Sequence, residues 1–192
     1  MEIAYLRGVM RITRQMLVRR WAITSISAAV VFAVLLVLDL WLKSLSGFGT
    51  ADLQTFSTAP DYRYAFRHWP PIYAVRAGFN LGLDYLLMPL YAAAFFYSGI
   101  LAREAFAPRP GRARRMLTAL AAVPLAGALL DGCENALQFS MMLWGATDAM
   151  AGLAAMLSHA KWAALAVGVA LLVGAVMGQV AERQKRAVKT GP

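Results

Sequence analysis

Residues 116–144 read MLTALAAVPLAGALLDGCENALQFSMMLW. This stretch is uncharged apart from Asp131 and Glu134, and it is long enough to cross a membrane, because a ~30 Å hydrocarbon core needs about 20 helical residues. Three more apolar stretches of similar length cover about 21–42, 77–102 and 152–181. Together they predict four membrane-spanning helices.

Composition supports the same fold class. Of the 192 residues, 60% are hydrophobic, and the mean hydropathy is +0.55. The four spans and their connections use nearly the whole chain, so we expect a single membrane domain over 1–192 and no separate soluble domain. The predicted fold is an all-α membrane protein, a four-transmembrane-helix bundle with an N-terminal amphipathic helix.

The amphipathic helix is predicted over residues 1–20. Arg7, Arg11 and Arg14 repeat at the spacing of one helix face, whereas apolar residues such as Leu17 line another. A helix of this kind lies in the interface of an anionic membrane leaflet. A cytoplasmic extension of the first span explains the same residues equally well, and both interpretations stay open. A cleaved signal peptide is disfavoured, because the apolar run that follows is too long for one.

Basic residues are concentrated on one side of the predicted membrane. Fourteen of them precede the first span, join the second and third spans, or form the tail: Arg7, Arg11, Arg14, Arg19, Arg20, Arg103, Arg109, Arg112, Arg114, Arg115, Arg183, Lys185, Arg186 and Lys189. The opposite side has Lys43, Arg63, Arg67 and Arg76. The positive-inside rule therefore predicts an inner (plasma) membrane protein with both termini in the cytoplasm. Because the span ends account for the net charge of +9, we expect no nucleic-acid partner.

The predicted outer loop, residues 43–76, interleaves aromatic and basic side chains. Its central part reads DYRYAFRHWPP over residues 61–71. Such a segment suits the headgroup layer of a membrane. It could be a lid over an outward-facing pocket or a connector that rests on the membrane surface, and we favour the connector.

Acidic residues lie inside three of the four spans. A charge at membrane depth costs at least ~2.5 kcal/mol, so such residues usually face a protein interior and mark a site. The polar residues fall on helical stripes of the second and third spans. These candidates are Asn80, Asp84 and Tyr91, then Asp131, Glu134, Asn135 and Gln138. Helical rise places Asp131 near the middle of its span and Glu134, Asp84, Asp39 and Lys161 toward the outside, so the polar groups gather in the outer half of the bundle.

Several candidates also have a purely structural explanation. Asp39 and Lys43 are spaced i, i+4, and we expect a simple ion pair between them near the interface. Lys161 shares an inward face of the fourth span and could neutralise one of the three acids on the second and third spans. Those three acids still outnumber this one cation, which favours a role for them in ligand binding.

A metal or cofactor site is only weakly indicated: acidic oxygens on two helices could hold Mg²⁺ or Ca²⁺, but no further pattern supports such a site. The Glu-x-x-His pair of di-iron bundles is absent. Haem ligation would need both His68 and His159, and only His159 lies in a predicted span. Cys133 is the only cysteine, so neither a disulfide nor a thiolate site can form within the chain. We expect no metal and no cofactor.

The run from Asp39 to Tyr91 resembles the EXPERA family, the four-span proteins of the emopamil-binding protein and sigma-two receptor type. The similar features are an acid that closes the first span, an aromatic outer loop that ends in two prolines, and an acid shortly before a proline: Leu38-Asp39-Leu40, Pro70-Pro71, and Asp84 with Pro89. The resemblance implies an occluded pocket for an amphiphilic, often cationic, lipid-like ligand, with Asp39 and Asp84 as its acids.

Three functions are compatible with these patterns. The leading hypothesis is binding of a lipid-like or amphiphilic small molecule in an acidic pocket, with membrane lipids as partners. The second is an accessory subunit of a larger membrane complex, which requires a protein partner. The third is a membrane enzyme that acts on lipid, with Asp131 and Glu134 as acid and base. We favour a protein that is not an enzyme, because no complete catalytic set is evident.

Overall fold

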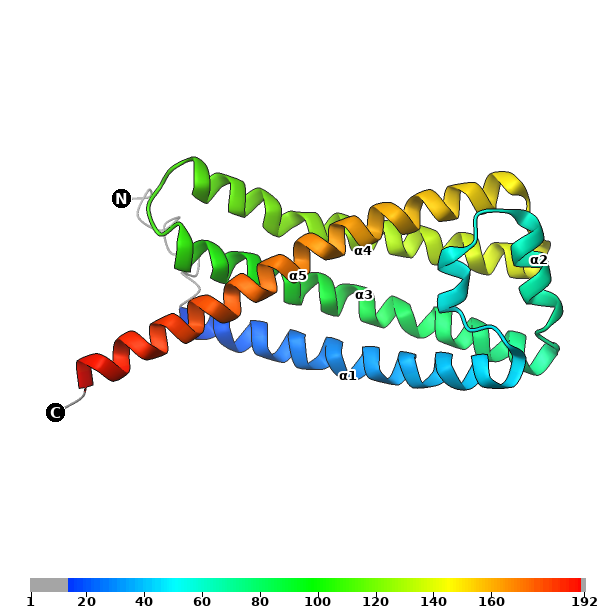
Figure 1. The fold of residues 1–192 in the computed structure, drawn as a ribbon, viewed down its shortest axis with the longest axis horizontal. Coiled ribbons are helices and arrows are strands. Elements are labelled where there is room, and N and C mark those ends of the chain that lie inside the picture. The colour runs from blue at the N-terminus through cyan, green and yellow to red at the C-terminus, as the bar shows by residue number, and fades with distance from the viewer. Residues whose placement is uncertain (1–13, 191–192) are drawn as a thin grey trace, which may run out of the picture.

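The computed structural model describes residues 14–190, and this part of the chain is almost entirely helical. The elements follow in the order α1 (Arg14–Ser46), η2 (Ala51–Thr55, a 3-10 helix), α2 (Ala59–Arg67), α3 (Pro71–Phe106), α4 (Arg112–Trp144) and α5 (Asp148–Thr190). Helices α1, α3, α4 and α5 run lengthwise, and the first and last described residues lie at the same end (Figure 1). The predicted all-α four-helix bundle is confirmed.

All four long helices are long and apolar enough to cross a membrane. Helix α1 has 33 residues and is therefore about 50 Å long, more than the ~30 Å hydrocarbon core. Each of the four helices is also longer than the apolar range predicted for it, because the helix continues past the apolar stretch at one or both ends. Large apolar side chains lie exposed on their outer faces, such as Val30 at 58% and Leu129 at 74%. Such surfaces are stable against lipid and unfavourable in water, as expected of a membrane-embedded protein.

The start of α1 bears on the predicted amphipathic helix. Residues 14–20 are continuous with the first span, so for them the extension interpretation holds. Residues 1–13, which carry the rest of that prediction, lie outside the described residues.

Two of the long helices end at glycines with positive φ. Gly47 (φ +83°) follows α1 and Gly145 (φ +93°) follows α4. Their N–H groups donate to the carbonyls of Lys43 and Met141, at 2.8 and 3.0 Å. This left-handed conformation favours glycine, because a Cβ would clash with the backbone. The turn at Gly145 brings α4 and α5 together as antiparallel neighbours, as its short length predicts.

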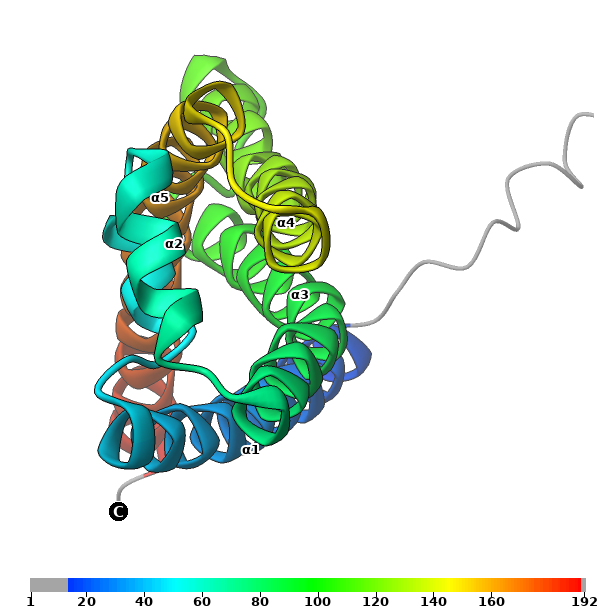
Figure 2. The same ribbon diagram turned by 90° about the vertical axis from the view of Figure 1, so that its right-hand side faces the viewer.

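The connection between α1 and α3 folds over one end of the bundle. It spans residues 47–70, less than the predicted 43–76, since α1 and α3 both extend into it. Figure 2 looks onto this end and shows η2 and α2 on the side of α5, which both of them contact. Tyr62 and Trp69 are buried there against the bundle, while Arg63 and Arg67 are exposed. Residues 47–70 therefore cover this end of the bundle, which corresponds to the lid alternative rather than to the favoured connector. We call these residues the lid, this end of the bundle the capped end, and the opposite end the terminal end.

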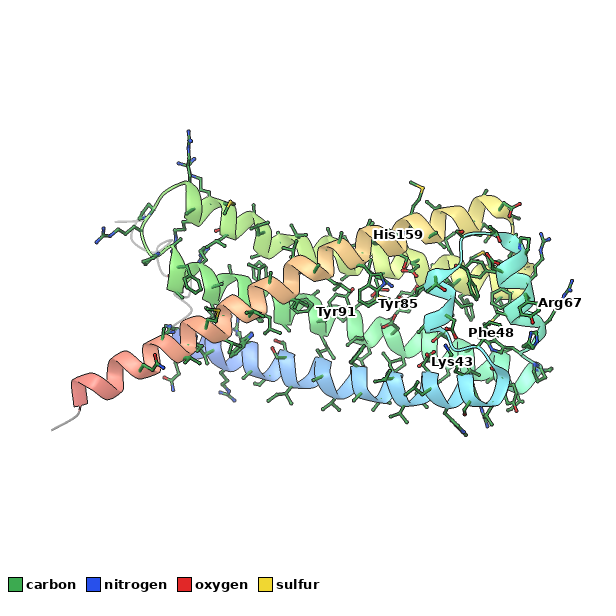
Figure 3. The ribbon with its side chains drawn as sticks, viewed as in Figure 1. Lys43, Phe48, Arg67, Tyr85, Tyr91 and His159 are labelled. Atoms are coloured by element: carbon green, nitrogen blue, oxygen red, sulfur yellow. The ribbon has the colours of Figure 1, made fainter. Side chains whose placement is uncertain are left out.

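Helix α1 packs along α3 and makes at most isolated contacts with α5. Midway along the bundle, a buried cluster joins α1 to α3: Ala28, Leu35, Leu87, Met88, Tyr91 and Ala92. At the terminal end a second cluster brings α1 and α5 together through Leu17, Leu101 and Ala175. Figure 3 shows Lys43, Phe48 and Arg67 at the capped end and Tyr91 midway along α3. α1 and α5 therefore meet at the terminal end and separate toward the capped end.

Candidate functional site

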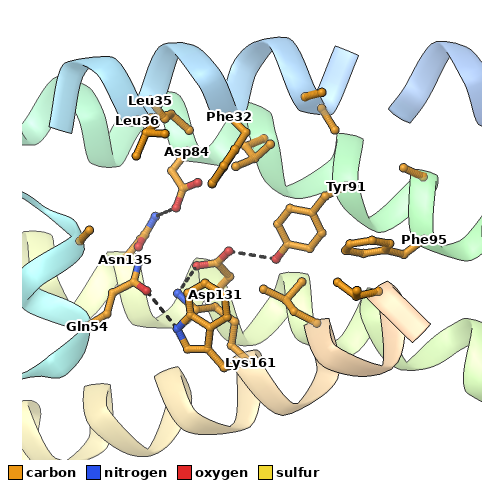
Figure 4. Close-up of a pocket in the computed structure, with 18 of the residues that line it drawn as sticks. Phe32, Leu35, Leu36, Gln54, Asp84, Tyr91, Phe95, Asp131, Asn135 and Lys161 are labelled. Atoms are coloured by element: carbon orange, nitrogen blue, oxygen red, sulfur yellow. Dashed lines mark hydrogen bonds and ion pairs between the residues drawn. The ribbon is translucent and has the colours of Figure 1, made fainter. Parts of the chain in front are cut away.

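A cavity of about 530 Å³ lies between the four long helices, on the bundle side of η2 (Figure 4). Its volume falls in the ~300–1,000 Å³ range of small-molecule sites. Most of its wall is apolar. Its polar and charged lining residues are Ser25, Thr50, Gln54, Asn80, Asp84, Tyr91, Asp131, Asn135 and Lys161.

Lys161 of α5 is the cation of the site, and it lies between two carboxylates of α4. Its Nζ is 2.9 Å from Asp131 Oδ1 and 2.6 Å from Glu134 Oε2. All three side chains are almost fully buried, with exposures of 3%, 6% and 0%. The second oxygen of each acid also has a donor, Tyr91 Oη at 2.9 Å from Asp131 and Gln138 Nε2 at 2.8 Å from Glu134. The predicted pairing of Lys161 with an acid of the neighbouring spans is confirmed, and it involves two acids.

Asp84 of α3 faces the same cavity with different partners. Its Oδ2 accepts a hydrogen bond of 2.8 Å from Asn135 Nδ2 of α4. Among the described residues, no Lys, Arg or His lies within ion-pair distance of Asp84. The neutral amide therefore orients this carboxylate without balancing its charge.

A chain of hydrogen bonds fixes the lid to α1 and α3. Thr50 Oγ1 donates to Asp39 Oδ1 at 2.7 Å, and Asn80 Nδ2 donates to Thr50 Oγ1 at 2.7 Å. The Ala51 N–H adds a bond of 3.1 Å to Asp39. Gly49 allows this approach, because a Cβ there would lie 2.5 Å from an oxygen of Asp39. Asn80 is 5% exposed and lines the cavity, and its Oδ1 accepts no hydrogen bond.

The predicted ion pair between Asp39 and Lys43 was wrong. Lys43 Nζ instead lies 2.6 Å from Asp52 Oδ1, and Asp39 accepts bonds from the lid. The i, i+4 spacing allows contact along one helix, but the folded lid supplies nearer partners for both side chains.

The predicted site residues divide into two groups. Six of the nine line the cavity: Asn80, Asp84, Tyr91, Asp131, Asn135 and Lys161. Glu134 and Gln138 do not line the cavity: Glu134 pairs with Lys161 and accepts a hydrogen bond from Gln138. Asp39 does not line the cavity either and accepts hydrogen bonds from the lid. The resemblance named Asp39 and Asp84 as two acids of one pocket, and of these only Asp84 lines the cavity.

Sequence reasoning missed the residues that the lid and the fourth span add. Thr50, Ala51 and Gln54 line the cavity from the lid side, and Trp162 lines it from α5. The Trp162 indole N–H donates to Gln54 Oε1 at 3.1 Å. Only the interfacial preference of tryptophan could have drawn attention to Trp162, and no periodic pattern marks the lid residues.

The contacts of the acidic residues bear on the metal and enzyme hypotheses. Among the described residues, no group of three His, Cys, Asp or Glu side chains could hold a metal ion. The acid and base of the enzyme hypothesis share one lysine, and only Asp131 reaches the cavity. In comparisons with known proteins, the chain matches no family model, no curated protein and no solved structure. The resemblance to the EXPERA family stays a prediction.

Proposed function

We propose that this chain binds an amphiphilic, lipid-like molecule in the cavity. Its head donates a hydrogen bond to Asp84, and its apolar part lies along the apolar wall. The observation that carries this proposal is the Asp84 carboxylate on the cavity wall, which has no cation within ion-pair distance among residues 14–190; Asn80, on the same wall, has a buried Oδ1 without a donor there. The two residues are four apart on α3 and so share one face.

The charges of the site favour a cationic head over an anionic one. Asp84, Asp131 and Glu134 carry acidic groups, and Lys161 is already engaged by the last two. An uncompensated carboxylate at membrane depth is unfavourable. A ligand ammonium group beside Asp84 would offset its charge, and a hydroxyl group would supply a donor without a charge. An anionic head would meet repulsion.

The test compares three single-chain probes that differ only in the head: octadecylamine, octadecanol and octadecanoic acid. Protein reconstituted in phosphatidylcholine nanodiscs is offered each probe, and retention is measured by native mass spectrometry. We expect the amine to be retained most and the acid least. Asp84→Asn keeps the hydrogen bond to Asn135 possible and should reduce amine retention about 10-fold or more, since a charged hydrogen bond contributes ~1.5–3 kcal/mol.

Asp61→Asn is the matched control, because Asp61 is an exposed acid of α2. It should leave retention unchanged. Equal retention of acid and amine, or equal retention by wild type and Asp84→Asn, would contradict the proposal. A stoichiometric membrane protein that co-purifies, with no retained amphiphile, would favour the accessory-subunit alternative.

We also propose an inner-membrane location with both termini, and so the terminal end, in the cytoplasm. The uneven distribution of basic residues supports this orientation. In a Cys133→Ser background, a cysteine at Thr58 of the lid should react with a membrane-impermeant maleimide on intact cells. A cysteine at Thr190 should react only after permeabilisation. The reverse pattern would invert the proposed topology and place the lid in the cytoplasm.

A further inference from the structure

On the side of the cavity between α1 and α5, no other helix of residues 14–190 covers it. α1 and α5 both line it, yet they make at most isolated contacts with each other. Along the gap, α1 presents Phe32 and Leu36, and α5 presents Trp162 and Val169. These four side chains line the cavity and are also 47–56% exposed. The gap is therefore a place where the apolar wall of the cavity continues onto the outer surface of the bundle.

Both ends of this gap are closed. At the terminal end, Leu17 of α1 and Ala175 of α5 belong to one buried cluster, and Arg14 Nη2 donates to Gln179 Oε1 at 3.3 Å. At the capped end, the lid residues Thr50, Ala51 and Gln54 form the cavity wall. Access from either aqueous end requires these buried and part-buried contacts to break, whereas access from the side requires only the exposed Trp162–Gln54 contact to break.

From these contacts we infer that the ligand enters sideways from the bilayer, between α1 and α5, and that the Trp162–Gln54 hydrogen bond latches this opening at the capped end. The inference rests on the proposed function and names the source of its ligand, a membrane amphiphile with a single alkyl chain. The cavity-lining part of α1, from Ser25 to Leu36, has a helical rise of about 17 Å, which suits an extended chain lying along the gap.

The lid is held to the bundle on both of its sides, and one of its contacts is exposed. Toward α1 and α3, Thr50 and Ala51 make buried or part-buried hydrogen bonds with Asp39 and Asn80. Toward α5, the Ala59 N–H donates to Asp148 Oδ1 at 2.9 Å, and among the described residues the side-chain bond of η2 is that of Gln54 with the exposed Trp162. A single exposed hydrogen bond contributes little and breaks readily. The Gln54–Trp162 contact, at the wall of the cavity, is therefore the part of the lid that opens.

The experiment follows exchange of a bound probe. Nanodiscs that contain the protein loaded with deuterated octadecylamine are mixed with excess phosphatidylcholine vesicles that contain the unlabelled amine, and native mass spectrometry gives the exchange rate. Trp162→Phe removes the latch but keeps an aromatic ring, and it should speed exchange about 2- to 10-fold. Trp144→Phe is the control, because Trp144 is 80% exposed and does not line the cavity.

A second variant narrows the opening. Ala29 lines the cavity from an exposed position of α1, so Ala29→Trp should slow exchange at least about 5-fold. Its neighbour Val30 is exposed but does not line the cavity, and Val30→Trp should exchange at the wild-type rate. The two test variants thus change the rate in opposite directions, so a general loss of stability cannot imitate the result.

The outcomes separate the access route from the function. If wild type retains octadecylamine but all four variants exchange at one rate, sideways entry is refuted and the binding function stands. If wild type retains no probe, both proposals fail together. If a second copy or another protein shields a cysteine at Ala29 from a lipid-soluble maleimide, the gap is a protein interface and the inference is overturned.

Discussion

Lys161→Met removes the cation that the buried carboxylates of Asp131 and Glu134 share. We expect a large loss of stability, because Asp131 and Glu134 then remain in the interior without a counter-charge. Breaking a buried ion pair by deleting one partner costs ~3–5 kcal/mol. The geometry supports this range, since both Nζ–oxygen distances are below 3.0 Å and all three side chains are at most 6% exposed.

The loss can be measured by thermal unfolding in detergent, followed by circular dichroism. For a chain of this size, each kcal/mol shifts Tm by ~2–4 °C, so Lys161→Met should unfold about 6–20 °C below wild type. Asp131→Asn should cost less, because Lys161 keeps Glu134 as a partner. Lys43→Met is the control. It breaks the exposed pair with Asp52, and exposed pairs contribute ~0–1 kcal/mol.

A triple variant tests the cause. Lys161→Met with Asp131→Asn and Glu134→Gln removes all three charges while conserving shape, and it should recover most of the lost Tm. A Tm shift below about 2 °C for Lys161→Met, or a triple variant no more stable than the single one, would refute the assignment of this cluster as a tightly coupled ion-pair network.

Two further predictions concern the lid. Gly49→Ala should lower the free energy of unfolding by ~1–3 kcal/mol, because the new Cβ would displace the Asp39 carboxylate. Gly82→Ala is the control and should not destabilise the protein, because nothing lies within 4 Å of a Cβ at that position. Equal effects of the two substitutions in chemical unfolding would contradict this account. Burial, followed by the charge of Glu134, raises the pKa of Tyr62 from 10.0 to about 12. Between pH 10 and about 12, Tyr62 is ionised in the unfolded chain but not in the folded protein. The free energy of unfolding therefore falls as the pH rises through this range, by ~2–3 kcal/mol in total. Tyr62→Phe should flatten that part of the stability–pH curve, and an unchanged slope would count against the buried phenol.

The sequence alone determined the fold class and six of the residues that line the cavity. Four apolar stretches of sufficient length predict four spans, because backbone groups in lipid must be satisfied within a helix. Helical periodicity also placed Asp84 and Asp131 on inward faces, since charges avoid lipid. These predictions depend only on spacing along one helix, which the sequence contains directly.

Only the tertiary structure decided which inward groups meet. Periodicity gives the face of a helix but neither the neighbour across from it nor the offset between two helices. It therefore could not show that Lys161 engages both Asp131 and Glu134 and leaves Asp84 without a cation. The i, i+4 rule failed at Asp39 for the same reason. The partner of Asp39 is Thr50 in the folded lid, and Gly49 allows the lid to lie this close to Asp39, which spacing along the sequence cannot show.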